Sequence, residues 1–205
     1  MRVRSYRWLT ATLAVLGLLA DQASKYEVFR QLFPGAAEFP RGENDLLPGW
    51  FKLTAEFDPA TPPSDGAVRP LQTYSAPVMP RVNHGALFGL GGHKKGGANL
   101  FFAGVSLAAA TGIVVWVTRP SAARDGWLSA ALGLILGGTV GNLYDRLVFG
   151  GVRDFLYFYK IDWPVFNVAD CCLVVGAGML LLHAVVTPSD PKPAPAEPAA
   201  VPAAG

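Results

Sequence analysis

Long apolar runs constrain this chain more than any other feature of its sequence. Leu100–Val117 and Trp127–Leu143 contain no charged residue, and Trp163–Val186 contains a single acid, Asp170. Such runs approach or exceed the roughly 20 residues that a helix needs to cross a bilayer. Charged residues make up only 16% of the chain, against roughly 25% in ordinary soluble domains. The sequence therefore predicts a membrane protein rather than a soluble enzyme.

A fourth apolar run, Trp8–Ala20, follows three arginines and is 13 residues long, which is short for a membrane span. A cleaved signal peptide is one interpretation. Cleavage after Ala20 would place Leu18 where a small residue is required, and the polar residues that follow have helical composition. We therefore favour a retained first helix and predict four spans.

Basic residues predict the orientation of these spans. The N-terminal arginines, together with Arg119 and Arg124 between the second and third runs, indicate cytoplasmic segments by the positive-inside rule. Both termini are then cytoplasmic, and the segments 26–98 and 144–162 lie outside. We expect an all-α four-helix transmembrane bundle over residues 1–186, followed by a disordered Pro/Ala-rich tail over 187–205.

The outer segment 26–98 is inserted between the first two spans and is too long for a bare loop. Trp50–Thr54 has strand composition and lies between turn-forming residues, which predicts a small extracytoplasmic β structure resting on the membrane. Six prolines within 58–80 predict an irregular excursion. In the third run, glycines at positions 133, 137 and 141 predict close helix packing.

Polar residues gather where the four predicted spans reach the outer face. Helical spacing puts Asn167 and Asp170 on one face, and counting from Trp163 places Asp170 about 10 Å into the bilayer. A charge at that depth is costly and indicates a functional role. The polar residues at the outer ends are Asp21, Lys25, Asn142, Asp145, Arg146, Asp154, Asn167 and Asp170.

Structural roles remain open for most of these residues. The sequence also admits ion pairs at the membrane interface, hydrogen bonds between helices, and a solvated acid before an aromatic belt. The three histidines are expected to be solvated or interfacial, and the adjacent cysteines to be unreactive packing residues. The residues with these alternatives are Asp21 with Lys25, Asp145 with Arg146, Asn142, Asn167, Asp154, His84, His93, His183, Cys171 and Cys172.

Several kinds of chemistry lack a motif in this sequence. It contains no serine-nucleophile, zinc-protease or phosphate-loop motif, and its two cysteines are adjacent. A net charge of +2 argues against a nucleic-acid partner. Asp154 and Asp170 remain, and paired carboxylates with one shared proton can activate water, as in aspartic proteases.

Five segments in order resemble the motifs of bacterial lipoprotein signal peptidase, the type II signal peptidase. The resemblance covers roughly residues 7–186. The stretch 58–80 is longer than is usual in this family, and Leu87 stands where a small residue is common. The matching segments are Asp21–Lys25, Asn83–Gly89, Gly141–Arg146, Gly150–Phe155 and Phe166–Asp170.

The resemblance implies a cofactor-free and metal-free aspartic endopeptidase of the bacterial inner membrane, with its active site on the extracytoplasmic side. Its substrates would be diacylglyceryl-modified prolipoproteins, cleaved before the lipidated cysteine, and it would contact phospholipid, act as a monomer and bind no nucleic acid. Asp154 and Asp170 match the catalytic dyad. The residues that match substrate-orienting positions are Asn142, Arg146, Asn167 and Asn83, and those that match supporting positions are Asp21 and Lys25.

Two further expectations follow from the residues themselves. Asp154 lies in a loop beside Arg153, so we expect it to ionise first and act as the base, with Asp170 holding the proton. A proton-coupled channel and a non-catalytic membrane chaperone are the competing functions. The channel is disfavoured because the second and third runs carry no charge through their middle.

Overall fold

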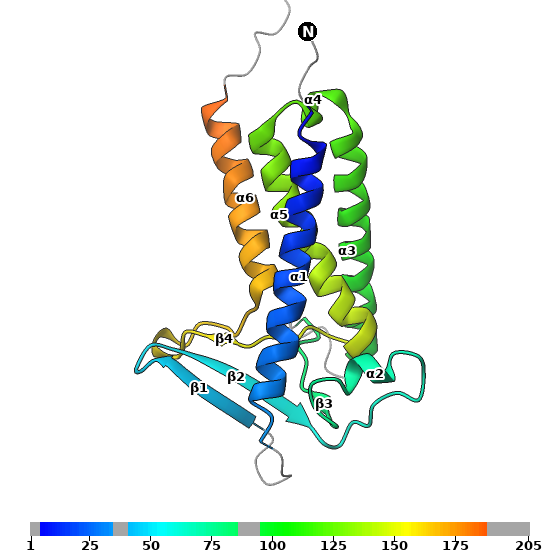
Figure 1. The fold of residues 1–205 in the computed structure, drawn as a ribbon, viewed down its shortest axis with the longest axis vertical. Coiled ribbons are helices and arrows are strands. Elements are labelled where there is room, and N and C mark those ends of the chain that lie inside the picture. The colour runs from blue at the N-terminus through cyan, green and yellow to red at the C-terminus, as the bar shows by residue number, and fades with distance from the viewer. Residues whose placement is uncertain (1–4, 35–40, 86–94, 188–205) are drawn as a thin grey trace, which may run out of the picture.

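The computed structural model describes residues 5–34, 41–85 and 95–187. Within these ranges four long helices stand side by side, and a small sheet lies at one end of them (Figure 1). The described chain begins and ends at the opposite end from the sheet (Figure 1). The long helices are α1 (Arg7–Gln31), α3 (Lys95–Thr118), α5 (Gly126–Phe149) and α6 (Val168–Val186).

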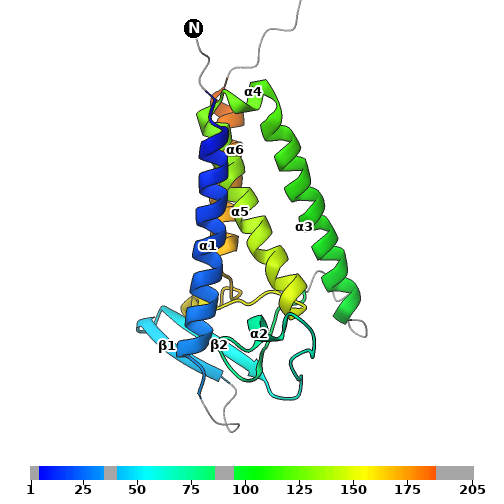
Figure 2. The ribbon, with the colours of Figure 1, turned by 45° about the vertical axis from the view of Figure 1, so that its right-hand side comes forward.

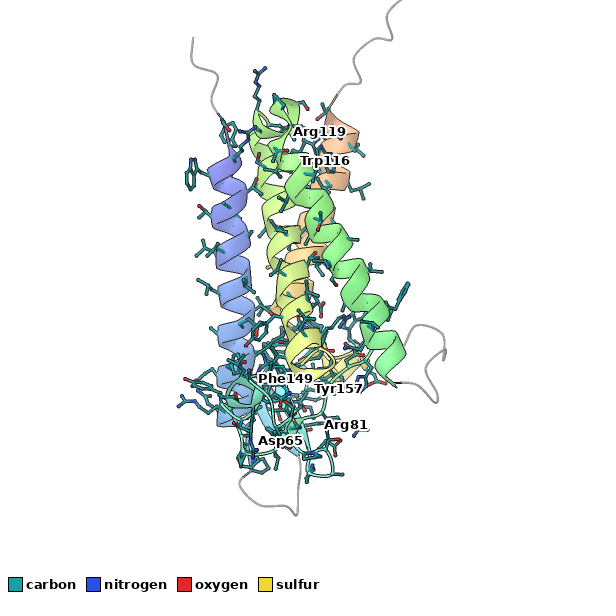
Figure 3. All side chains as sticks on the ribbon, turned by 90° about the vertical axis from the view of Figure 1, so that its right-hand side faces the viewer. Asp65, Arg81, Trp116, Arg119, Phe149 and Tyr157 are labelled. Atoms are coloured by element: carbon teal, nitrogen blue, oxygen red, sulfur yellow. The ribbon has the colours of Figure 1, made fainter. Side chains whose placement is uncertain are left out.

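Among the described residues, three helices are long and apolar enough to cross a membrane, namely Gly97–Thr118 of α3, all of α5 and all of α6. Polar residues occupy the last part of α1, beginning at Asp21, so only its first part is apolar. Side chains along the middle of the bundle are almost entirely hydrocarbon, whereas polar atoms gather at the sheet end (Figure 3). The prediction of several membrane helices is confirmed.

Helix α5 lies at the centre and packs against α1, α3 and α6. Its glycines permit the close approach to α1, because a Cβ on Gly137 would lie 2.7 Å from the backbone oxygen of Ala14. A Cβ on Gly133 would lie 2.8 Å from the backbone oxygen of Thr10. The predicted packing role of these glycines is confirmed. Helix α3 instead leans away from α1 toward the sheet end (Figure 2).

The apolar runs do not coincide with the helices that contain them, and the helix start assumed at Trp163 is wrong. Helix α5 continues beyond the apolar run and ends only where Gly150 adopts a φ of 75°, which suits glycine. Helix α6 begins at Val168 rather than at Trp163, because Asn167 caps it. Asp170 therefore lies in the first turn of α6, and the estimate that placed it about 10 Å along a helix is wrong.

The predicted strand belongs to an antiparallel hairpin, which confirms a small β structure in the outer segment. The hairpin joins β1 (Arg41–Leu47) to β2 (Phe51–Asp58). Two short strands, β3 (Met79–Pro80) and β4 (Leu156–Tyr157), pair with β2. A buried cluster then fixes the sheet against the end of α1, and its members are Phe29, Ala55, Phe57, Ala76 and Phe155.

The Pro-rich excursion is mostly irregular, as predicted, and its one helix, α2 (Arg69–Gln72), is a single turn. It nevertheless packs firmly on the bundle. Gln72 Nε2 donates to the backbone oxygen of Val148 at 2.6 Å, and Ser75 Oγ donates to that of Tyr26 at 2.7 Å. The excursion therefore covers the sheet-side ends of α1 and α5.

His84 differs from the expectation of a solvated ring, whereas nothing in the structure contradicts the interfacial position expected for His183. His84 Nδ1 lies 3.0 Å from the backbone oxygen of Gly150 and is partly buried. At the far end of the bundle, His183 Nε2 lies 2.6 Å from Oδ2 of Asp125, the N-cap of α5 after the short α4 (Pro120–Ala123). His93, Leu87 and the tail from residue 188 lie outside the described residues.

Candidate active site

Asp154 and Asp170 come together through two bridging carboxamides. Asn167 Nδ2 donates to Asp154 Oδ1 at 2.7 Å, and Asn142 Nδ2 donates to Asp170 Oδ1 at 2.9 Å. Asn167 Nδ2 also donates to Asn142 Oδ1 at 3.2 Å. An unbroken chain of hydrogen bonds therefore joins the two carboxylates, and both asparagines are buried.

Hydrogen bonds at the start of α6 fix the position of the Asp170 carboxylate. Asn167 Oδ1 accepts from the Asp170 backbone N–H at 3.0 Å, and Asp170 Oδ2 accepts from the Asn167 backbone N–H at 3.2 Å. This reciprocal pair is a capping box, which satisfies two backbone donors at the helix start. A negative charge is also favoured at a helix N-terminus. Asp170 therefore lies in the first turn of the helix, in contact with Asn142 and Asn167.

Backbone pairing on both sides holds Asp154 in place. Val152 and Asn83 exchange hydrogen bonds of 2.8 and 2.9 Å between their backbones. On the other side, the Phe155 N–H donates to the Phe166 oxygen at 2.9 Å, and its oxygen accepts from the Thr54 N–H at 2.9 Å. The loop is thereby fixed between the outer segment and the start of α6, and Asp154 faces Asn167.

Burial raises the pKa of Asp154 to about 6, and the nearby charge of Asp170 acts in the same direction. Hydrogen bonds from Asn83 Nδ2, at 3.0 Å, and from Asn167 oppose this shift without cancelling it. The Arg153 guanidinium pairs with Asp145 instead. This raised pKa runs against the expectation that Asp154 ionises easily because it lies near water and Arg153.

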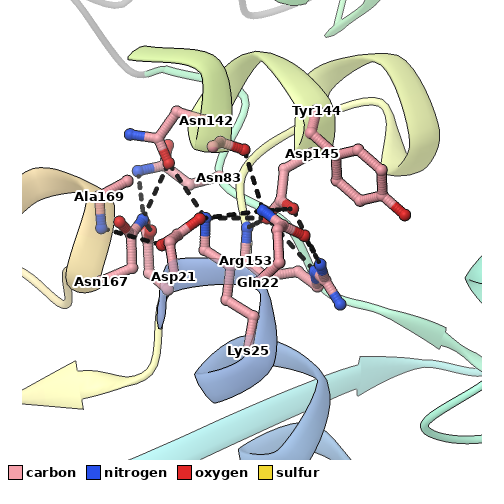
Figure 4. A network of polar contacts seen from close by, with 12 residues as sticks. Asp21, Gln22, Lys25, Asn83, Asn142, Tyr144, Asp145, Arg153, Asn167 and Ala169 are labelled. Carbon is pink, nitrogen blue, oxygen red and sulfur yellow. Dashed lines mark hydrogen bonds and ion pairs between the residues drawn. The ribbon is translucent and has the colours of Figure 1, made fainter. Parts of the chain in front are cut away.

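A buried ionic network lies directly behind the asparagines (Figure 4). Lys25 Nζ is 2.8 Å from Asp21 Oδ2, 3.3 Å from Asp145 Oδ2 and 3.1 Å from Asn142 Oδ1. Lys25, Asp21 and Asp145 have no exposed surface. Asp21 and Lys25 therefore form the ion pair that their spacing suggested, but the pair is buried inside the protein. Lys25 also connects the network to the asparagine that contacts Asp170.

Asp21 also ties the helices together around this network. Its Oδ1 accepts from the backbone N–H of Ala169, in the first turn of α6, at 2.9 Å. A Cβ on Gly141 would lie 2.6 Å from Asp21 Oδ2, so only glycine leaves space for the carboxylate. A residue of α1 thereby positions the start of the helix that carries Asp170.

Arg153 is the partner of Asp145, whereas sequence reasoning paired Asp145 with Arg146. Arg153 Nη2 lies 2.9 Å from Asp145 Oδ1 and donates to Gln22 Oε1 at 2.9 Å. Its guanidinium also lies 3.9 Å from the centre of the Phe149 ring. The sequence assigned no role to Gln22, and it gave Arg153 only an electrostatic influence on its neighbour Asp154.

Arg146 points away from this network toward α3. Its guanidinium lies 5.4 Å from the centre of the Phe102 ring, within the electrostatic range of Asp154 and Asp170. Its Nε and Nη1 are buried and have no hydrogen-bond partner among the described residues. Unused donors beside two acids suit Arg146 to an oxygen of a bound molecule.

A polar pocket of about 300 Å³ opens beside Asp154 on the sheet side. Its walls come from β2, from the segment after β3 and from the segment before α6. Among the described residues, no group of three His, Cys, Asp or Glu side chains is arranged to hold a metal ion. Besides Asn83 and Asp154, the pocket is lined by Thr54, Glu56, Arg81, Val82, Pro164 and Val165.

The profile of a protein family described as signal peptidase (SPase) II matches residues 76–186. The lipoprotein signal peptidase of Symbiobacterium thermophilum is 33% identical over 180 residues, which cover 87% of this chain and 95% of that protein. The one from Rhodopirellula baltica is 47% identical over 116 residues, only half of each chain.

Two solved structures share this fold. Two chains described as a bacterial membrane enzyme superpose with a TM-score of 0.64 each, at 19% and 20% identity. The superpositions cover 94% and 92% of this chain and 99% of each of the others. From the family match and the near full-length likeness to the Symbiobacterium protein, the chain belongs to the signal peptidase II family.

Proposed function

We propose that this chain is an aspartic endopeptidase of the membrane that removes the signal peptide from diacylglyceryl-modified prolipoproteins, cutting before the lipidated cysteine. The observation that carries the proposal is the hydrogen-bonded chain from Asp154 through Asn167 and Asn142 to Asp170. Two carboxylates in one site do not ionise together easily, so one proton is held between them.

We assign that proton to Asp154 and the role of base to Asp170. The raised pKa of Asp154 supports this assignment, as does the helix N-terminus at Asp170. Asp170 takes a proton from water while the water oxygen attacks the scissile carbonyl carbon, and Asp154 protonates the carbonyl oxygen. As the tetrahedral intermediate collapses, one of its hydroxyls returns a proton to Asp154, the C–N bond breaks and the leaving nitrogen takes the proton held by Asp170.

The polar residues around the dyad orient it and the substrate. Asn142 and Asn167 donate hydrogen bonds to the two carboxylates, and Asn83 donates one to Oδ2 of Asp154. The buried free donors of Arg146 suit the developing negative charge on the scissile carbonyl or a neighbouring substrate oxygen. Asp21 and Lys25 support the site from behind through Asn142 and the start of α6.

The substrate class comes from the relatives, which are named lipoprotein signal peptidase. We infer that the chain works as a monomer surrounded by phospholipid, with neither a cofactor nor a nucleic-acid partner. The apolar surface of its helices supports the bilayer setting.

We further propose that α1 is a fourth span and that both termini are cytoplasmic. The positions of the two ends support this, because the described chain begins and ends opposite the sheet (Figure 1). The dyad then lies at the extracytoplasmic face of the bacterial inner membrane. Residues 1–186 form the peptidase domain, with the segment 26–98 inserted, and the tail follows.

Cleavage of a purified lipid-modified precursor in detergent tests the function directly. We expect a shortened product, and Asp154→Asn or Asp170→Asn should each remove nearly all cleavage. Asp65→Asn is the matched control, because this side chain is 97% exposed and takes no part in the proposed site. Near-normal cleavage by a folded dyad variant would make the carboxylates structural and overturn the proposal.

A further inference from the structure

The pocket beside Asp154 contains groups that the proposed hydrolysis does not use. Its volume, about 300 Å³, is at the small end of the range for ligand pockets, which suits one or two residues of a peptide. Glu56 and Arg81 contribute charges of opposite sign, and Pro164 and Val165 contribute an apolar wall. None of these four residues lies in a membrane-spanning helix.

The side chains on the two sides of the dyad differ in polarity. Toward α3, Arg146 lies against the Phe102 ring among helices apolar enough to span a membrane. Toward the sheet, Asp154 lines the polar pocket. A substrate cut at the dyad has the same asymmetry, because its signal peptide is apolar and its mature part leaves the membrane.

We propose that this pocket, with the Glu56–Arg81 ion pair in its wall, is a subsite for the first residues that follow the lipidated cysteine, and that it selects among them by charge. The inference rests on the proposed function and names which part of the substrate lies on the sheet side. Glu56 favours a basic residue and disfavours an acidic one, and Arg81 does the reverse.

The geometry of the ion pair suits this role. Arg81 Nη1 lies 3.2 Å from Glu56 Oε2, with the side chains 73% and 36% exposed. The Arg81 backbone N–H donates to the Glu56 oxygen at 2.8 Å, so the backbone fixes both positions without the side chains. An exposed pair contributes little to stability, so either charge can turn to a ligand and either variant should fold.

The experiment compares two precursors that differ only in carrying Lys or Asp at the second or third position, counting the cysteine as the first. The measured quantity is the ratio of kcat/KM for the Lys precursor to that for the Asp precursor. Glu56→Gln should lower this ratio about two- to five-fold, and Arg81→Gln should raise it by a similar factor. Both effects should shrink at high salt.

Glu43→Gln is the matched control, since Glu43 pairs with Lys52 at 2.7 Å on the same hairpin but does not line the pocket. Opposite shifts in the two pocket variants, with an unchanged ratio in the control, support the subsite. Ratios that stay at the wild-type value in both pocket variants, or that shift equally in the control, overturn it while leaving the peptidase intact. A wild-type protein that cleaves neither precursor removes the proposed function and the subsite together.

Discussion

Asp154 and Asp170 are held by different means, and this difference is the basis of the roles proposed for them. Asp154 lies in a loop fixed by backbone pairing, where burial raises its pKa to about 6. Asp170 lies in a capping box and accepts a hydrogen bond from Asn142. The same residue type is thereby adapted to hold a proton in one place and to accept one in the other.

The pH dependence of kcat/KM follows from this assignment. The pKa of Asp154 is raised, so its protonated form persists up to about pH 6 and is lost as the pH rises further. We expect kcat/KM to fall on the alkaline side about tenfold per pH unit, since this quantity reports the free enzyme. A profile of precursor cleavage from pH 4 to 9 measures it. A rate that rises steadily through pH 6 to 8 would reverse the proton assignment.

Replacement of the orienting residues should reduce turnover without preventing folding. Alanine at Asn142, Asn167 or Arg146 removes a contact to the dyad or to the substrate, and we expect losses of roughly 10- to 1000-fold in kcat. Arg146→Lys should lose less, because it keeps the charge but not the planar donors. Cleavage rates are compared with those of Asn44→Ala, an exposed position on β1. Wild-type rates in all three alanine variants would mean that the site lies elsewhere.

Helix α5 organises the bundle because its small residues admit α1 on one face while its polar end supports the dyad. Gly137→Ala should be destabilising, since the new Cβ would lie 2.7 Å from the Ala14 backbone oxygen. Overpacking of this kind typically costs about 1–3 kcal/mol. Thermal unfolding in detergent provides the measurement.

Gly112→Ala on α3 is the matched control for this substitution. A Cβ there meets nothing within 4 Å, so the variant should unfold at or slightly above the wild-type temperature. Equal unfolding temperatures for the α5 and α3 variants would contradict the close packing of α1 on α5.

The Pro-rich excursion acts as a structural cover over the outer ends of two helices. Gln72→Ala would leave the buried Val148 oxygen without its donor, which typically costs about 1–3 kcal/mol. Thr73→Ala removes only an exposed bond to the Arg69 oxygen and is the control.

Deleting residues 59–77 would also remove Ala76 from its buried cluster, so the protein should be less stable. Some cleavage should nevertheless survive. Unfolding temperature and residual activity are the two measurements.

The bundle and the sheet together define how the protein sits at a bilayer surface. The hairpin turn and the short helix η1 (Tyr159–Ile161) pack together, with Lys160 Nζ lying 3.6 Å from the centre of the Trp50 ring. Large apolar side chains are exposed here, next to the start of α6. They are Leu46, Leu47, Trp50, Ile161 and Trp163. Such a cluster suits the interfacial region of a membrane.

Fluorescence quenching tests this placement. In a variant that keeps Trp50 and Trp163 and replaces the other three tryptophans with phenylalanine, we expect strong quenching by lipids brominated near the headgroup. Lipids brominated deep in the acyl chain should quench less, because the aromatic rings lie at headgroup level. Efficient quenching by aqueous iodide without any lipid effect would place the hairpin in water.

The membrane class and the family could be predicted from local features of the chain. Apolar runs of bilayer length predict helices because an unpaired backbone is too costly in hydrocarbon, whatever the rest of the chain does. The same local reasoning identified the packing glycines of α5, since a missing side chain permits close approach wherever the partner comes from. Asp170 stood out because a charge within an apolar run is rare, whereas Asp154 was singled out by the absence of other catalytic motifs and by the family resemblance.

Tertiary packing decided the boundaries and the pairings. Asn167 caps α6 within the last apolar run, so the helix begins at Val168 and Asp170 lies in its first turn. Asp145 pairs with Arg153, eight residues away, rather than with its neighbour Arg146, because successive helical side chains point in different directions. The partner of a buried charge and the pKa of Asp154 depend on distances between segments far apart in sequence, and only the packed chain sets those distances.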